Sequence, residues 1–290
     1  MEFLRAADWR AALEAKAAGG RVLPIAGGTD VMVQVNAGRC RPDALLDLGS
    51  VAELGGWEEA GGHLRVGAGM TYTRLIEELG GRLPGLAQAA RTVGSRQIRN
   101  RATIGGNLGT AAVKGITHPL LLACGARVEA ASAAGTRMID ADRFYLPGGR
   151  NALRDGELIR AVWTPPATGP QYFAKVGVRN AMVTALCSFA IVLRPEHRRV
   201  GTGMGAAAPV PKAARAAEDF LAGELDWDGL GPLAPPVVER FARLVQQDCD
   251  PEDGPHAGAA YRRHALGVLA RRTLCWAWDE HRRAAGVRAR

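Results

Sequence analysis

The sequence predicts an α+β protein in two parts: a larger mixed part, then a smaller part of antiparallel sheet plus helices. Three observations predict this fold class. In the first part, strand-like and helical runs follow one another without the regular βαβ order of a dinucleotide fold. A segment rich in Pro and Gly, 164–170, then interrupts the pattern. Beyond it strands come first and helices follow, so we expect domains over 1–168 and 169–290.

Hydrophobic periodicity and glycine punctuation give the expected elements of each part. In the first part, the expected helices are 7–19, 70–79, 86–93 and 118–124, and the expected strands are 21–25, 44–48, 64–66, 126–130 with a partner beyond the turn at Gly135, and 157–163. In the second part, the expected strands are 171–176, 183–193 and 199–204, and the expected helices are 212–221, 237–246 and 257–278. Segment 94–110, rich in Gly, Asn and Arg, has neither helical nor strand periodicity.

Length and composition indicate a globular protein. A chain of 290 residues with 47% hydrophobic and 23% charged residues is able to bury a proper core. It contains no run of about 18 apolar residues, as a membrane span would need. Its N-terminus lacks the apolar core and the cleavage site of a signal peptide. We therefore expect a cytoplasmic protein with no membrane span.

The cysteines and histidines show no pattern of a metal site. The five cysteines are scattered and include no CxxC pair, which argues against disulfides, zinc and iron–sulfur clusters in this chain. Cys124 and Cys187 lie in apolar runs and are expected to be buried, inert thiols. The six histidines form no HxH or HExxH cluster. We expect no metal ion.

The net charge of +8 does not by itself indicate nucleic-acid binding. The arginines are dispersed, and the chain has neither an aromatic platform nor a helix-turn-helix pattern. We expect solvated basic faces and a docking surface for a protein partner, with no nucleic acid bound.

Two glycine-containing loops carry the functional signal. In the first, 26–30 (Ala-Gly-Gly-Thr-Asp), a strand runs into paired glycines, and in the second, 103–107 (Thr-Ile-Gly-Gly-Asn), a short strand is expected to do the same. Paired glycines permit positive φ and a close approach of the backbone to a ligand. Either loop alone is weak evidence, because such turns are common. Together they predict a diphosphate held by backbone amides from both loops.

A third glycine motif, 201–206 (Gly-Thr-Gly-Met-Gly-Ala), matches the dinucleotide-binding pattern without its context. That pattern requires a helix directly behind it, and here Pro209 and Pro211 interrupt. We expect this segment to be the end of a strand that leads into a loop.

These loops and several other segments resemble a known family, the FAD-binding medium subunits of molybdenum hydroxylases of the xanthine dehydrogenase and carbon monoxide dehydrogenase type. The matching segments are 26–30, 45–48, 94–107, 156–159, 175–179, 205–209 and 260–264. They cover nearly the whole chain in order, and the run 94–107 (GSRQIRNRATIGGN) is the most specific of them.

The resemblance implies an FAD-binding domain of the vanillyl-alcohol-oxidase (PCMH) type in two subdomains, followed by a smaller C-terminal domain of the carbon monoxide dehydrogenase flavoprotein type. It implies an extended FAD with its pyrophosphate on the two glycine loops, and no catalytic side chain. The positions that match the family's flavin contacts are Ala26, Gly27, Gly28, Thr29, Asp30, Val93, Gly94, Thr103, Ile104, Gly105, Gly106, Asn107, Ile159 or its neighbour Leu158, and Lys175. Lys175 matches a lysine near the isoalloxazine, where a cation would favour the anionic reduced flavin, and an exposed strand lysine is an equal alternative.

The chain departs from the family pattern after the second loop. Where the family has Ala-Ser-Pro-x-x-Asp, this sequence has a rewritten segment, 111–116, with Ala112 at the Ser position and Ile116 at the Asp position. Loss of a charged hydrogen-bond acceptor weakens binding by roughly 1.5–3 kcal/mol unless another group replaces it. Lys114 and Thr117 are the candidates for that replacement.

These expectations leave three hypotheses. The first is the flavin subunit of a heterotrimeric molybdenum hydroxylase, in which a molybdopterin-binding large subunit hydroxylates the substrate. An iron–sulfur small subunit then passes the electrons to FAD in this chain, for delivery to an external acceptor. The second is a stand-alone FAD-dependent oxidoreductase or oxidase of a biosynthetic pathway, favoured by Lys114 and His118 in the rewritten segment. The third is a partner-binding protein without flavin. The intact glycine loops oppose the third hypothesis, because no structural need for both loops is expected.

Overall fold

The N-terminal segment forms a small parallel sheet with the strand order β1-β3-β2. The computed structural model describes residues 1–288. The strands of this sheet are β1 (Glu2–Arg5), β2 (Val22–Ile25) and β3 (Ala44–Asp47). Helix α1 (Trp9–Ala17) connects β1 to β2, and Asp8 caps it by accepting a hydrogen bond from the Ala11 amide at 2.7 Å. Helix α2 (Val31–Asn36) follows β2 and contains no buried residue.

The second subdomain is a five-stranded antiparallel sheet with the order β4-β5-β10-β6-β7. Its strands are β4 (Trp57–Ala60), β5 (His63–Gly67), β6 (Arg127–Ser132), β7 (Gly135–Asp140) and β10 (Leu158–Thr164). The helical elements around it are η1 (Ala52–Leu54), α3 (Tyr72–Leu79), α4 (Pro84–Arg91), α5 (Arg96–Arg99), α6 (Ile104–Thr110), α7 (His118–Ala123) and α8 (Ala141–Phe144), and a short hairpin is made of β8 (Tyr145–Leu146) and β9 (Arg150–Asn151). One continuous hydrophobic core joins both subdomains.

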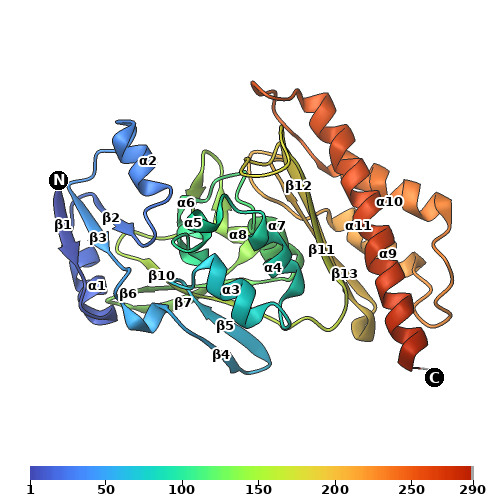
Figure 1. The fold of residues 1–290 in the computed structure, drawn as a ribbon, viewed down its shortest axis with the longest axis horizontal. Coiled ribbons are helices and arrows are strands. Elements are labelled where there is room, and N and C mark those ends of the chain that lie inside the picture. Colours follow the sequence, from blue (N-terminus) through green and yellow to red (C-terminus); the bar gives the residue numbers. More distant parts are fainter. Residues whose placement is uncertain (289–290) are drawn as a thin grey trace.

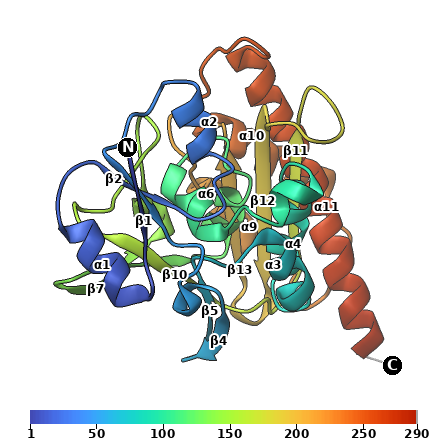
Figure 2. The same ribbon diagram turned by 60° about the vertical axis from the view of Figure 1, so that its left-hand side comes forward.

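The C-terminal domain is an antiparallel sheet with the order β11-β12-β13, backed by helices. Its elements are β11 (Gln171–Val176), β12 (Cys187–Arg194), η2 (Pro195–His197), β13 (Arg199–Gly205), α9 (Arg215–Glu224), α10 (Pro235–Asp248) and α11 (Ala259–Arg288). The sheet stands between α4 and α7 on one face and α9–α11 on the other (Figure 1), and the turned view shows the same layers (Figure 2). Strand β12 is therefore buried on both faces: Phe189 and Ile191 enter the C-terminal core, while Ala190 and Val192 enter the N-terminal core.

The predicted two-part α+β fold is confirmed, and most expected elements are found within a few residues of their predicted ends. The prediction for 94–110 is wrong, because this segment contains helices α5 and α6. Ser95 caps α5 and Thr103 caps α6, each through a side-chain oxygen that accepts from an amide three residues on. The residues after Thr103 are the first turn of helix α6 and not the end of a strand. The sequence did not indicate this helix because its paired glycines interrupt the hydrophobic periodicity.

The glycine motif 201–206 is the end of β13, as expected, and no helix follows it directly. Its glycines have a packing role. A Cβ atom on Gly203 would overlap the backbone of Pro119, and one on Gly201 would overlap the Ala123 carbonyl group. Both contacts are with helix α7. Glycine here lets a helix of the N-terminal domain lie directly on the C-terminal sheet.

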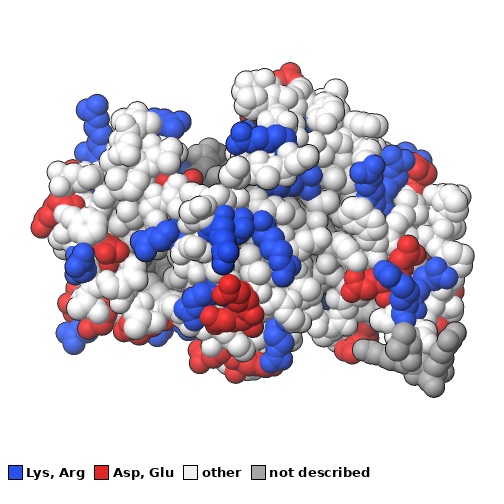
Figure 3. Space-filling view, in the orientation of Figure 1, with Lys and Arg blue, Asp and Glu red and all other residues white. Residues whose placement is uncertain are grey.

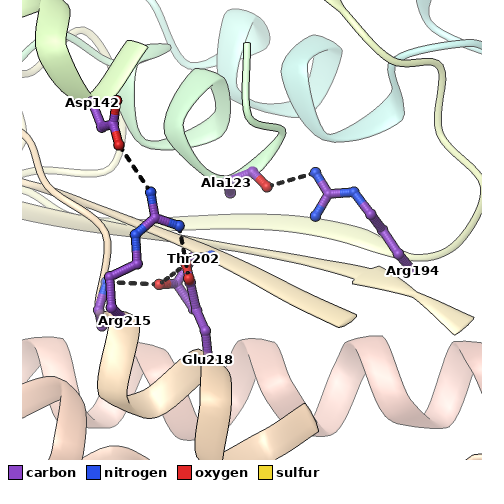
Figure 4. Close-up of polar contacts among 7 residues, drawn as sticks. Ala123, Asp142, Arg194, Thr202, Arg215 and Glu218 are labelled. Atoms are coloured by element: carbon purple, nitrogen blue, oxygen red, sulfur yellow. Dashed lines mark hydrogen bonds and ion pairs between the residues drawn. The ribbon is translucent and has the colours of Figure 1, made fainter. Parts of the chain in front are cut away.

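Polar contacts reinforce this junction (Figure 4). Arg194 in β12 donates to the Ala123 carbonyl oxygen at 2.9 Å. Arg215 in α9 reaches across to Asp142 in α8 at 3.2 Å and also pairs with Glu218 at 2.9 Å. Glu218 is buried and accepts hydrogen bonds from both the amide and the hydroxyl of Thr202. Hydrogen bonds, an ion pair and close backbone packing thus hold the two domains together.

The two cysteines expected to be inert thiols are found in the core. Cys124 and Cys187 are buried, and burial raises their thiol pKa values to about 11 and about 12. Within residues 1–288, no cluster of three His, Cys, Asp or Glu side chains could hold a metal ion. In the same residues, no helix has both the length and the apolar character to cross a bilayer. Charges of both signs are spread over the face in Figure 3.

We predict that Gly203→Ala destabilises the chain, because the added methyl group meets the Pro119 backbone, which cannot move away without shifting α7. Overpacking of this kind costs about 3 kcal/mol. Urea unfolding measures the loss. Gly223→Ala in α9 is the matched control, since its added methyl group meets nothing within 4 Å and alanine favours a helix. Equal stability of the two variants would contradict the packing role.

Candidate functional site

A long cavity of about 820 Å³ runs between the two N-terminal subdomains and reaches the C-terminal domain. Leu23 of β2 lines it from the small parallel sheet, Ile159 of β10 from the larger sheet, and Met182 from the β11–β12 loop. A ligand that fills this cavity is extended and contacts all three units. The volume lies in the upper part of the range of about 300–1,000 Å³ that is typical of ligand pockets.

The first glycine loop follows β2 directly and lines one end of this cavity. Gly28 has φ of 73°, a value that favours glycine, and the chain turns there into α2. Within residues 1–288, the amides of Gly27, Gly28 and Thr29 donate to no protein acceptor. Three consecutive unpaired amides facing a cavity form an anion-binding concavity, because exposed N–H groups converge on one negatively charged group. The loop therefore suits a phosphate or diphosphate.

The second loop differs from the expectation. The amides of Ile104 and Gly105 donate to the carbonyls of Met70 and Ala68, and those of Gly106 and Asn107 donate to Thr103. These four amides are already used inside the protein. Thr103, Gly105, Gly106 and Asn107 of this loop all line the cavity, but none of the four amides from Ile104 to Asn107 is free to bind a ligand. Backbone amides that are free to bind an anion are thus found in the first loop and not in the segment from Ile104 to Asn107 of the second.

Glycines in both loops also have a packing role that was not expected. A Cβ on Gly27 would overlap the Arg101 carbonyl group, and a Cβ on Gly105 would stand 2.6 Å from the Ala68 carbonyl oxygen. The contact of Gly27 packs the first loop against Arg101, which lies just before the second loop in the chain. A structural need for both glycine loops therefore exists, and their presence alone does not exclude a flavin-free protein.

The structure brings together nearly all the residues proposed from the sequence. Those that line the cavity are Ala26, Gly27, Gly28, Thr29, Asp30, Val93, Gly94, Thr103, Gly105, Gly106, Asn107, Leu158 and Ile159. Arg99 fixes Val93 and Gly94 by donating to both of their carbonyl oxygens, at 3.1 and 3.2 Å. Ile104 and Lys175 do not line the cavity, and the side chain of Ile104 is fully buried in the core.

Lys175 lies one layer behind the cavity wall. Its ammonium group donates to the carbonyl oxygens of Thr92 at 3.0 Å and Val183 at 3.1 Å. Burial lowers its pKa. Val93 and Val183 are cavity-lining residues, so Lys175 joins two segments of the wall that come from different domains. It is neither an exposed strand lysine nor a direct wall residue.

The rewritten segment also forms part of the wall. Ala112, Lys114 and Ile116 all line the cavity. Lys114 is exposed, and no hydrogen bond or ion pair holds its ammonium group to another described residue. This part of the wall therefore combines an apolar side chain, Ile116, with the unpaired cation of Lys114.

His118 is fully buried directly behind this segment. Its Nε2 lies 3.2 Å from the carbonyl oxygen of Asn107, so the Nε2 atom carries the proton and donates. The ring stacks on Tyr145 with centroids 4.6 Å apart, and a Cβ on Gly115 would overlap the ring. Burial lowers the pKa of His118 to about 4. The side chain is therefore a neutral anchor for α6 at ordinary pH.

Several wall residues were missed by the sequence argument. Tyr72, Ile98, Met182 and Arg154 line the cavity, but they come from helices and loops without a glycine signal. The turn at Arg154 lies just before segment 156–159, which the sequence analysis had singled out for its resemblance to the family. It is fixed by Glu157, which accepts from the Arg154 amide at 2.6 Å and forms two hydrogen bonds with Arg137. These bonds also lower the pKa of Glu157.

A cavity between two subdomains, with a loop of unpaired amides at its edge, defines a class, the proteins that hold an extended anionic ligand such as a nucleotide cofactor. Comparison with known proteins specifies the family. A family described as the FAD binding domain in molybdopterin dehydrogenase matches residues 1–167, and the CO dehydrogenase flavoprotein C-terminal domain matches residues 172–277. The chain belongs to this family of FAD-binding subunits of molybdenum hydroxylases.

Individual relatives agree with this assignment. The chain is 29% identical over 260 residues to the xanthine dehydrogenase FAD-binding subunit of Escherichia coli, covering 86% of each chain. It is 29% identical over 259 residues to the nicotine 6-hydroxylase medium subunit of Paenarthrobacter nicotinovorans, covering 86% of this chain and 87% of that one. In fold it matches the carbon monoxide dehydrogenase of Hydrogenophaga pseudoflava with a TM-score of 0.89 and 25% identity, over 97% of this chain and 98% of that chain.

FAD is accordingly the cofactor of this family, and the residues present fit it. The unpaired amides of the first loop suit a diphosphate, and the cavity of about 820 Å³, lined by both N-terminal subdomains and by the β11–β12 loop, has room for a dinucleotide. The chain is an oxidoreductase subunit of the flavoprotein type.

We predict a loss of stability at acidic pH that depends on His118. Its pKa is about 4 in the folded chain and 6.5 in the reference state, so unfolding takes up a proton between these values. Stability from this group is complete above pH 6.5 and decreases as the pH falls towards 4, by up to about 3 kcal/mol. Urea unfolding of the flavin-free chain against pH measures it.

The control is His118→Leu, which fills the site without a titrating group. Its absolute stability is lower, because the hydrogen bond to Asn107 is lost, but its slope between pH 6.5 and 4 should be shallower than that of the wild type. Identical slopes would show that His118 does not titrate in this way.

Proposed function

We propose that this chain is the electron-transfer subunit of a molybdenum hydroxylase. It would hold FAD between an iron–sulfur partner subunit and an external electron acceptor, while a molybdopterin-binding large subunit transforms the substrate. The observation that carries the proposal is the row of unpaired amides from Gly27 to Thr29 at the edge of a cavity lined by both domains. We further propose domain limits of 1–168 and 169–290, and a cytoplasmic location.

When bound, FAD supplies the ability to accept electrons singly or in pairs, and the chain supplies binding and orientation. The proposed contacts are the first loop for the diphosphate, Val93 and Gly94 beside the ring system, Asn107 along the chain, and Ile159 near the adenine. Lys175 acts indirectly, by holding the Thr92 and Val183 carbonyls, and thus both sides of the wall, in place.

A basic surface beside the cavity supports docking of a partner subunit. Arg96 and Arg101 flank Ile98, which lines the cavity and is 37% exposed. In residues 1–288, neither arginine lies within 4.0 Å of a carboxylate, whereas nearby Arg74 is paired with Glu78. Unpaired cations around an apolar residue favour an acidic partner surface and fast association.

A stand-alone FAD-dependent oxidoreductase or oxidase is the second candidate. The observation that favours it is the rewritten wall, in which Ile116 and Lys114 change the polarity and charge next to the cofactor. The two functions differ in one property. A stand-alone enzyme is reduced by an organic substrate alone, and an electron-transfer subunit is reduced only when its partners are present.

We predict that the chain purified alone is yellow and contains close to one FAD per chain, released on denaturation. Gly28→Val should lower this content strongly, because a β-branched residue is disfavoured at a φ of 73°. The visible spectrum and the chromophore released by acid measure both. A colourless wild-type chain that takes up no added FAD would refute the proposed function.

We also predict that Arg96→Glu with Arg101→Glu slows reduction of the flavin in the assembled complex. Reversal of two exposed charges at a docking surface reduces the association rate by about tenfold or more at low salt. Stopped-flow mixing of this chain with its partner subunits measures the rate. The control pair is Arg10→Glu with Arg39→Glu, two arginines distant in sequence from α5. Equal rates for both pairs would contradict docking at α5, and FAD content should not change in either pair.

A further inference from the structure

A buried chain of hydroxyl groups ends on a side chain of the cavity wall. Tyr72 Oη lies 3.3 Å from Thr117 Oγ1, and Thr117 Oγ1 lies 2.7 Å from Asn107 Oδ1. Thr117 is 0% exposed, and Tyr72, although it also lines the cavity, is 1% exposed, so no solvent completes their hydrogen bonds. Asn107 lies half-buried at the end of the chain and lines the cavity.

The direction of these hydrogen bonds follows from a count of protons. Burial raises the pKa of the Tyr72 hydroxyl, which therefore stays protonated. If Tyr72 donates to Thr117 and Thr117 donates to Asn107, both hydroxyl protons have acceptors. If the Asn107 amide were turned over, its Nδ2 would donate to Thr117, and one buried hydroxyl proton would have no acceptor. Buried donors without partners are costly, so the first arrangement is favoured.

This arrangement leaves the Nδ2 group of Asn107 as the free end of the chain. Among the described residues, Nδ2 has no hydrogen-bond partner, and it is not one of the buried polar atoms that lack partners. It is therefore accessible from the cavity. The backbone of Asn107 is also fixed, since its carbonyl oxygen accepts from His118 at 3.2 Å and from Thr110 at 2.9 Å.

We propose that Tyr72 and Thr117 are positioning residues that lock Asn107 as a hydrogen-bond donor to the bound FAD. The inference rests on the proposed function, and it specifies that the FAD atom opposite Asn107 is an acceptor.

The test measures FAD affinity and the visible circular dichroism of the bound flavin in the full chain. Thr117→Val keeps the shape but lets Asn107 rotate, and it should weaken FAD binding by about threefold to tenfold, the effect of one hydrogen bond. Thr117→Ser restores the hydroxyl and should return the affinity to within about twofold of wild type. Tyr72→Phe should change both readouts in the same direction as Thr117→Val.

Two further variants separate positioning from a general loss of packing. Asn107→Asp still accepts from Thr117 but has no donor, so it should bind FAD more weakly than Thr117→Val does. In the Asn107→Ala background, Thr117→Val should have no further effect on affinity, because it acts only through Asn107. Thermal melting checks that each variant is folded.

The outcomes divide cleanly. If Thr117→Val binds FAD with unchanged affinity and dichroism, the positioning role is refuted while the proposed function stands. Additive effects of Thr117→Val and Asn107→Ala would also refute it. If the wild-type chain binds no FAD, both the proposed function and this inference are refuted.

Discussion

Direct contact between backbone and backbone is the constraint on which this structure depends. The first glycine loop lies against the Arg101 carbonyl, Gly105 lies against Ala68, and Gly203 lies against Pro119. Each contact leaves no room for a side chain. The first joins the two N-terminal subdomains, the second packs α6 against the chain just after β5, and the third joins the two domains. The first two contacts fix the glycine loops that line the cavity. The same glycines that permit a ligand to approach the chain therefore also hold the chain together, which is why glycine loops are ambiguous evidence for function.

Local sequence signals predicted much of the fold, and they failed where the signal was not local. The strands around 171–205 were predicted because apolar residues continue over their whole length. Helix α6 was not predicted, since glycine and asparagine are poor helix formers and its stability comes from the Thr103 cap and from packing. The wall residues Tyr72 and Met182 could not be predicted either. They belong to different domains, and only the folded chain brings them to one cavity.

The rewritten segment shows how a wall can change its chemistry while its backbone is retained. Ala111 takes a left-handed conformation and ends α6, and the Val113 carbonyl accepts from Ala206 in the C-terminal domain. These backbone contacts do not depend on the side chains at 112 and 116. Ala112 is exposed in the cavity wall, whereas Ile116 both lines the cavity and packs in the N-terminal core, so the apolar side chain at 116 serves both. Lys175 contrasts with them, because its side chain joins two domains and a substitution would disturb the wall from behind.

The cavity takes its walls from two N-terminal subdomains and from a loop of the C-terminal domain. A cofactor that fills it therefore acts as an additional internal link among three units. Such a link shifts the folding equilibrium by an amount that grows with the concentration of free cofactor relative to its dissociation constant. In a cell, the supply of flavin would then govern how long newly made chains survive proteolysis. Abundance of this protein would follow flavin metabolism as well as transcription of its gene.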